Sequence, residues 1–115
     1  MKIDISHIRI DSNQKVNDYV HKKIGRLEKF AGRHARKSAH AKVILSETKG
    51  KLKKPTCEAI LDLPGATLTA KESYDDMFSS IDAVESKLSV QVRRYKQKHS
   101  PSKSRQAIRK FMRRS

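Results

Sequence analysis

The chain has 115 residues, of which 36% are apolar and 34% are charged, and its net charge is +15. This length fits one domain around a single core, and the sequence contains neither the roughly 18 consecutive apolar residues of a membrane span nor the apolar stretch of a signal peptide. We therefore expect a cytoplasmic protein whose excess charge attracts a polyanion, with nucleic acid as the first candidate and an anionic membrane as the second.

The first third of the chain predicts a strand followed by one long helix. Residues 2–10, KIDISHIRI, are rich in β-branched side chains, and Ser12 or Asn13 can cap the helix that follows. Beyond this cap, apolar residues recur every three or four positions, which predicts about five helical turns ending near Gly32. Gly25 lies inside this helix at a cost of about 1 kcal/mol relative to Ala, and we interpret it as a point of close packing on the sheet.

Three further strands are predicted in the middle of the chain. Apolar and polar side chains alternate at residues 40–47, 56–63 and 66–72. The lysine-rich segment TKGKLKKP joins the first two, and Pro64-Gly65 makes a tight turn between the second and third. Each strand is expected to have one packed face and one solvated face.

A second helix of about 25 residues is predicted after these strands. Ser73 and Asp76 resemble a capping box that opens it. SPSKS at residues 100–104 ends it, and the segment at 105–112 is too short to be a stable helix alone. The predicted apolar stripe of the long helix is Met77, Phe78, Ile81, Val84, Leu88, Val92 and Tyr95.

The resulting order, β-α-β-β-β-α, predicts an α+β fold. The first β-α-β step implies a right-handed crossover between parallel strands, and the hairpins that follow are antiparallel. Two amphipathic helices then cover one face of a four-stranded sheet, as a two-layer sandwich. We expect this domain to span residues 1–99, followed by a basic tail at 100–115 that is disordered when unbound.

Positive charge is concentrated in one row on each predicted helix, with spacings of three and four residues. With the helices side by side, the rows would lie about 8–10 Å apart and would suit phosphates across a groove. A merely solvated helix surface is the plainer interpretation, but only Glu28 and Glu85 add opposite charge near the rows. The first row is Lys22, Arg26, Lys29 and Arg33, and the second is Lys87, Gln91, Arg94 and Lys98.

Two other features bear on RNA binding. The lysine-rich turn fits a third contact and a solubilising hairpin tip equally well. Sequence-specific recognition by base stacking is not supported by the sequence, because there is no Trp and no predicted strand carries an aromatic pair. The lysines of the turn are Lys49, Lys51, Lys53 and Lys54.

Catalytic and metal-binding patterns are absent from the sequence. The five histidines have no metal-ligand spacing, and the four glycines form no phosphate-binding loop. Asp75 and Asp76 are explained by the start of a helix, and Cys57, the only cysteine, by burial in a strand. We expect a protein that is not an enzyme and that needs no metal or cofactor.

Two segments resemble the ribosome hibernation-promoting factor family, which includes ribosome-associated inhibitor A. Residues 63–98 contain Asp-Met-Phe and Ile-Asp, followed by Lys-Leu, Gln and a basic Tyr-Lys run, which are similar to the family hallmark. Residues 19–30, YVHKKIGRLEKF, are similar to the family pattern in the first helix. The resemblance covers about residues 2–98.

This resemblance implies a fold similar to a double-stranded RNA-binding domain and a site on the rRNA of the small ribosomal subunit. A ribosome-associated monomer bound in the channel for mRNA and tRNA would compete with both and leave the ribosome idle during stress or stationary phase. The implied rRNA-binding residues are Lys22, Lys23, Arg26, Lys29, Arg33, Lys87, Gln91, Arg94 and Lys98.

Some positions depart from the family pattern. Val90 stands where the family commonly has Arg, and His7-Ile8 and Ser12-Asn13 replace Gly-Arg and Thr-Pro. The tail resembles neither the acidic extension of the inhibitor subtype nor the second domain of the long factors, so pairing of ribosomes and silencing of single ribosomes both stay open. The alternatives are a general double-stranded RNA-binding protein and a small basic structural protein of the ribosome.

Overall fold

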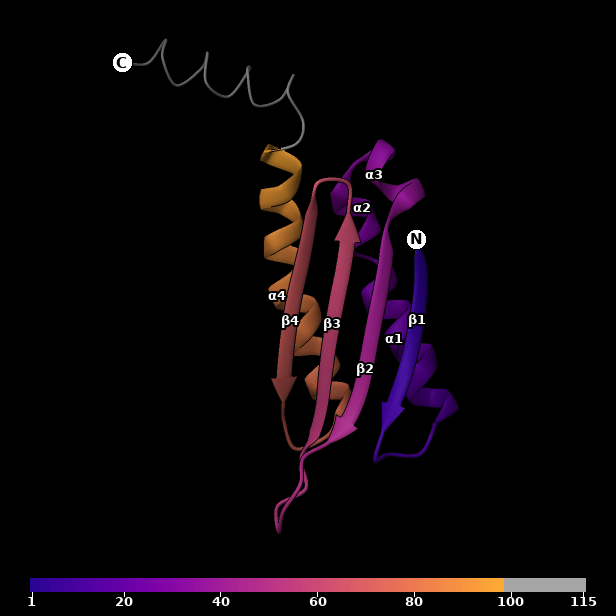
Figure 1. Cartoon of the computed structure of the whole chain (residues 1–115), viewed down its shortest axis with the longest axis vertical. Helices are drawn as coiled ribbons and strands as arrows, with labels where there is room; N and C mark the ends of the chain where they lie inside the picture. Colours follow the sequence, from indigo (N-terminus) through magenta and orange to yellow (C-terminus); the bar gives the residue numbers. More distant parts are fainter. Residues whose placement is uncertain (99–115) are drawn as a thin grey trace, which may run out of the picture.

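Figure 1 shows the computed structural model of the chain, which describes residues 1–98. The predicted helix end at 100–104, the segment at 105–112 and the tail at 100–115 lie outside the described residues. Within residues 1–98 the predicted order is found, with two short helices added before the second strand. The elements are β1 (Lys2–Ile8), α1 (Gln14–Gly25), α2 (Glu28–Ala31), α3 (Arg33–Ser38), β2 (His40–Glu47), β3 (Pro55–Leu63), β4 (Ala66–Ser73) and α4 (Met77–Lys98).

The strands form one sheet in the order β1-β2-β3-β4. β1 and β2 are parallel, with Ile5 opposite Val43, and the other neighbouring pairs are antiparallel. Gly65 in the tight turn between β3 and β4 has a φ of 80°, a left-handed conformation that glycine adopts without steric cost. Figure 1 shows α1 and α4 behind the same face of the sheet, so the predicted two-layer α+β sandwich is confirmed.

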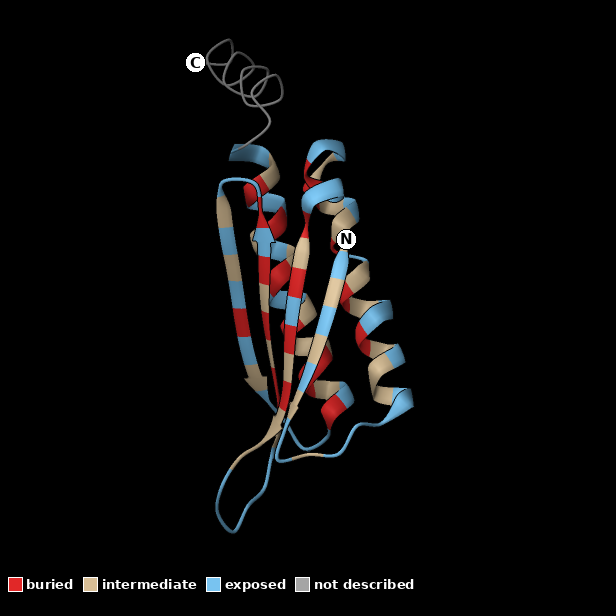
Figure 2. Ribbon diagram, turned by 45° about the vertical axis from the view of Figure 1, so that its right-hand side comes forward, coloured by how far each residue is buried: buried red, intermediate tan, exposed pale blue. Residues whose placement is uncertain are grey.

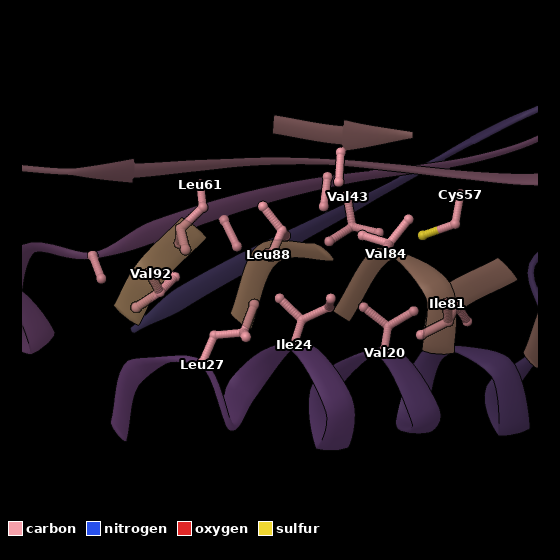
Figure 3. Packing of buried hydrophobic residues seen from close by; sticks show 14 of the residues in the cluster. Val20, Ile24, Leu27, Val43, Cys57, Leu61, Ile81, Val84, Leu88 and Val92 are labelled. Carbon is pink, nitrogen blue, oxygen red and sulfur yellow. The ribbon is translucent and has the colours of Figure 1, made fainter. Parts of the chain in front are cut away.

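The core lies between the sheet and these two helices (Figure 3). Ile24 of α1 and Leu88 of α4 are fully buried, and they face Val43 and Leu61 of the sheet. Burial of each such side chain stabilises the fold by about 1.5–3 kcal/mol. Cys57 is fully buried beside them, as predicted. Because both helices share this core, their rotation about their own axes is fixed, and this rotation decides which side chains reach solvent.

The first predicted helix is wrong in its continuity, because the chain turns twice where one helix of five turns was expected. α1 ends at Gly25, and the N–H of Leu27 donates to the carbonyl of Ile24 at 3.0 Å, a tight three-residue turn. Gly32, with a φ of 95°, then separates α2 from α3. Gly25 does face the sheet, but a Cβ there would meet Ile3 at 4.0 Å, so packing does not require glycine.

The start of α4 also differs from prediction. Asp76 is the capping residue, since its carboxylate accepts hydrogen bonds of 2.8 Å from both the N–H and the hydroxyl of Ser79. Ser73 instead ends β4, where its hydroxyl lies 2.6 Å from that of Thr56. The predicted capping box is therefore wrong in its first residue. Phe78 was also predicted to lie in the apolar stripe of this helix, but it is 39% exposed.

Candidate nucleic-acid interface

Helices α1 and α4 lie side by side and run in the same direction. The Tyr19 ring on α1 contacts the Phe78 ring at 5.0 Å between centroids, and further along Phe30 of α2 lies under Arg93 of α4. We call this line of contact the helical seam. It is lined by Tyr19, Lys23, Arg26 and Phe30 on one side and by Phe78, Asp82, Glu85 and Arg93 on the other.

Asp82 holds two side chains of α1. It accepts a hydrogen bond of 2.6 Å from the hydroxyl of Tyr19 and lies 3.4 Å from the ammonium group of Lys23. Partial burial alone would lower the pKa of Lys23, but the Asp82 carboxylate, together with Glu85 and Tyr19, outweighs this effect and raises that pKa. The Lys23 ammonium also lies 5.5 Å from the centroid of the Tyr19 ring. Lys23 is thus held as a cation inside the seam.

The next pair along the seam is Arg26 with Glu85, whose closest charged atoms are 4.0 Å apart. Oε2 of Glu85 is buried and has no hydrogen-bond partner among the described residues, whereas the side chain of Arg26 is 48% exposed. Arg26 therefore faces solvent with part of its charge offset by a neighbouring carboxylate. Lys23 and Arg26 are the two predicted rRNA-binding residues with a carboxylate partner in the seam.

The second predicted row does not face the first row across the seam. Lys87 forms an ion pair with Glu72 of β4, and the side-chain amide of Gln91 donates to the carbonyl of Thr69 at 2.9 Å. Arg94 and Lys98 are exposed and continue this line at helical spacing, along the side of α4 that faces the β4 edge. The side of α4 that faces α1 is occupied by Asp82 and Glu85 instead, because the buried stripe fixes the rotation of the helix.

The first predicted row is spread over three helices. Lys22 lies on α1, Lys29 on α2 and Arg33 on α3, and all three side chains are exposed. The turn at Arg26 and the break at Gly32 end the regular spacing on which the row was predicted. The structure still brings these cations to the helical side of the molecule, where charge is strongly unbalanced: residues 14–38 and 77–98 hold 13 Lys and Arg against four Asp and Glu.

The opposite face of the sheet has balanced charge. Along β2, the buried Ala41, Val43 and Leu45 alternate with less buried residues, which Figure 2 shows as alternating colours along the strand. Because successive side chains of a strand point to opposite faces, the less buried ones lie on the face away from the helices. We call the surface formed in this way by all four strands the open sheet face. Its charged residues are three lysines and three acids, with the imidazole of His40 2.7 Å from the carboxylate of Asp4. They are Lys2, Lys42, Lys71, Asp4, Glu58 and Asp62.

The lysine-rich turn projects beyond the sheet as the tip of the β2–β3 hairpin (Figure 1). Thr48 closes this turn, since its N–H donates to the carbonyl of Lys54 at 3.0 Å and its hydroxyl to that of Leu52 at 3.1 Å. All four lysines of the turn are exposed. This placement is compatible with both interpretations made from the sequence.

Residues 1–98 contain no group of three or more His, Cys, Asp and Glu residues placed to hold a metal ion. None of the helices in this part of the chain combines the length and the apolar character needed to cross a membrane.

Comparisons with known proteins show the family to which this α+β domain belongs. The family model described as "Sigma 54 modulation protein / S30EA ribosomal protein" matches residues 3–100. A ribosome hibernation promoting factor of Pseudomonas putida is 33% identical over 98 residues, which are 85% of this chain and 89% of the relative. The chain therefore belongs to the ribosome hibernation-promoting factor family, as the resemblance predicted.

Two solved structures have the same fold. The N-terminal domain of Thermus thermophilus Protein Y matches with a TM-score of 0.70 and 30% identity, over 83% of this chain and 99% of that one. A ribosomal subunit interface protein from Coxiella burnetii matches with a TM-score of 0.68 and 27% identity, over 84% and 98% of the two chains. Both matches support the assignment of the fold.

Proposed function

We propose that this protein is a ribosome hibernation factor that binds the rRNA of the small ribosomal subunit through its helical side and excludes mRNA and tRNA. The observation that carries this proposal is the charge asymmetry: 13 basic against four acidic residues along the helical spans, and three against three on the open sheet face. The names of the relatives, a ribosome hibernation promoting factor and a ribosomal subunit interface protein, support the ribosome as the partner.

The predicted rRNA-binding residues differ in how available their charge is. Lys22, Lys29, Arg33 and Arg94 are exposed and form no ion pair with a carboxylate of residues 1–98. Each can neutralise a phosphate and release a condensed counterion without first breaking an ion pair. Lys23, Arg26 and Lys87 each lie near a carboxylate. To bind a phosphate, each must leave that carboxylate or share its charge between the two anions. We expect the first group to contribute most of the affinity.

Inhibition of translation then follows from the volume that the bound domain occupies. The helices are anchored by fully buried side chains such as Ile24, Val84 and Leu88, so the domain keeps its shape when its surface charges meet phosphates. A rigid domain held in the mRNA and tRNA channel excludes these ligands sterically, and the proposed activity involves no bond making or breaking.

A pair of triple charge reversals tests which face binds. The helical-side variant is Lys22→Glu, Lys29→Glu and Arg94→Glu, and the matched control on the open sheet face is Lys2→Glu, Lys42→Glu and Lys71→Glu. Both change the net charge equally. Co-sedimentation with purified small subunits should weaken by on the order of 10²-fold or more for the first variant and much less for the control. Equal weakening would refute a helical interface.

Two further measurements separate this proposal from the alternative functions. A general double-stranded RNA-binding protein should bind a free RNA duplex as tightly as it binds small subunits. A structural protein of the ribosome should be present in every ribosome of growing cells, whereas a hibernation factor should accumulate on ribosomes of starved cells. Sedimentation of extracts from both cultures gives this comparison directly.

A further inference from the structure

Phe30 and Arg93 form the centre of a pocket at one end of the helical seam. The guanidinium carbon of Arg93 lies over the Phe30 ring, 4.6 Å from its centroid. A cavity of about 330 Å³ opens around this pair and is lined also by Lys29, Lys96 and Gln97. We call it the Phe30 pocket. Its residues come from α2 and α4, more than 60 positions apart in the sequence, so only the fold brings them together.

The lining of this pocket combines aromatic and cationic groups. It consists of a half-buried aromatic ring, a planar guanidinium, two ammonium groups and an amide, and it includes no carboxylate. A cavity of about 390 Å³ at the end of β1 provides a contrast, because Asp11 and Glu47 line it beside Arg9. Negative charge would oppose a phosphate there. The Phe30 pocket is therefore the more suitable cavity of the two for an anionic ligand.

The combination of groups also restricts the ligand. A bare phosphate needs cations but gains nothing from a ring, and a neutral apolar molecule gains nothing from three cations. A nucleotide uses both, since a base stacks on an aromatic ring or on an arginine plane while its phosphate meets lysines. The volume is near the lower end of the range for small-ligand sites, about 300–1,000 Å³, and suits one nucleotide.

We infer that the Phe30 pocket takes one unpaired RNA nucleotide, with its base stacked on the outer face of the Arg93 guanidinium and its phosphate held by Lys29 and Lys96. Phe30 supports the guanidinium from below and keeps it oriented. The inference rests on the proposed function, because the RNA that supplies the nucleotide is rRNA. It adds a contact that depends on the base to a surface that otherwise meets phosphates.

Two arginines, one inside the pocket and one outside it, make a matched test. Arg93→Lys keeps the charge but removes the plane that stacks on Phe30, and Arg36→Lys makes the same change at an exposed arginine of α3 outside the pocket. Each protein is titrated with a single-stranded oligoadenylate of 12 nucleotides and with an abasic oligomer of equal length and charge. The wild-type protein should prefer the base-bearing oligomer by about 5- to 100-fold, as expected for one stacked base.

The expected result is loss of this preference in Arg93→Lys and its retention in Arg36→Lys. A wild-type protein without the preference would overturn the inference, as would equal behaviour of the two variants. Co-sedimentation of the same proteins with small subunits separates the two proposals. If the wild-type protein fails to sediment, the proposed function is wrong; if it sediments but shows no preference between the oligomers, only the nucleotide site is wrong.

Discussion

The hydroxyl of Tyr19 on α1 donates a hydrogen bond of 2.6 Å to the carboxylate of Asp82 on α4 and so joins the two helices across the helical seam. Tyr19→Phe removes this bond alone and should lower the free energy of unfolding by about 1 kcal/mol, measured in urea at pH 7. Tyr74→Phe, at an exposed tyrosine, is the control and should change it by less than about 0.5 kcal/mol. Equal stability of the two variants would contradict the role of the bond.

The same hydrogen bond predicts that the free energy of unfolding depends on pH in the alkaline range. The hydrogen bond to Asp82, and secondly burial, raise the pKa of Tyr19 above its ordinary value of 10.0. A folded-state pKa above the unfolded one means that the contribution is complete below pH 10 and is lost as the pH rises beyond it. The difference between the wild-type protein and Tyr19→Phe should therefore shrink in urea titrations above pH 10.

Leu88 and Val90 test the packing of α4. Leu88 is fully buried, and Leu88→Ala should cost about 2–5 kcal/mol in the free energy of unfolding because it removes apolar contacts and leaves a cavity. Val90 is 48% exposed on the same helix, and Val90→Ala should stay within about 0.5 kcal/mol. A comparable loss in both variants would show that the helix is rotated from the position described.

The cap formed by Asp76 predicts that thermal stability depends on pH in the acid range. Hydrogen bonds from the backbone and the side chain of Ser79 lower the pKa of Asp76 from 3.8, so its capping contribution is present above that pH and is lost as the pH falls through the lowered value. Asp76→Ala should reduce the Tm well above pH 3.8, and the difference should shrink in acid. Asp76→Asn provides the control, because an asparagine caps without titrating. A difference that is constant with pH would exclude the charged cap.

Cys57 predicts low thiol reactivity in the folded protein. Burial first, and then the nearby Glu58 charge, raise the pKa of the Cys57 thiol to about 12 from an ordinary 9.0. Because the thiolate is the reactive form, a disulfide reagent at pH 8 should modify the native protein far more slowly than the protein unfolded in urea. Equal rates would show that β3 opens readily.

The salt dependence of binding to small subunits tests single phosphate contacts. Lys22→Gln should reduce the slope of log affinity against log salt by about 0.7–0.9 if Lys22 neutralises one phosphate. Lys42→Gln, on the open sheet face, removes the same charge and should leave the slope unchanged. Equal slopes for Lys22→Gln and the wild-type protein would remove Lys22 from the interface.

Periodicity predicted α4 well, because Val84, Leu88 and Val92 each lie on one stripe and all three are buried. It failed at the break after Gly25 for a physical reason: Leu27 keeps its apolar spacing and its burial although the backbone turns beneath it. α3 was missed although Ala35 and Ala39 continue the spacing of Ala31, since the prediction ended at Gly32. The spacing of apolar side chains indicates which residues are buried, but it says less about where a helix is interrupted.

The sequence allowed the basic residues of the candidate interface to be predicted, but not their arrangement in space or their ion-pair partners. The sequence indicates which side chains are basic, but the pairing of Asp82 with Lys23 depends on how two helices are rotated against one core. For the same reason, Lys87 was placed in a row facing α1, whereas it reaches Glu72 on β4. The contact of Phe30 with Arg93 joins residues far apart in the chain and had no local signal.

The contrast between the cationic helices and the neutral open sheet face gives the molecule a large electric dipole moment across its two layers. In the field of a polyanion such a molecule experiences a torque that turns its helices toward the source before any contact forms. Encounters would then begin from an aligned approach, and dissolved ions would slow association by shortening the distance over which this alignment acts.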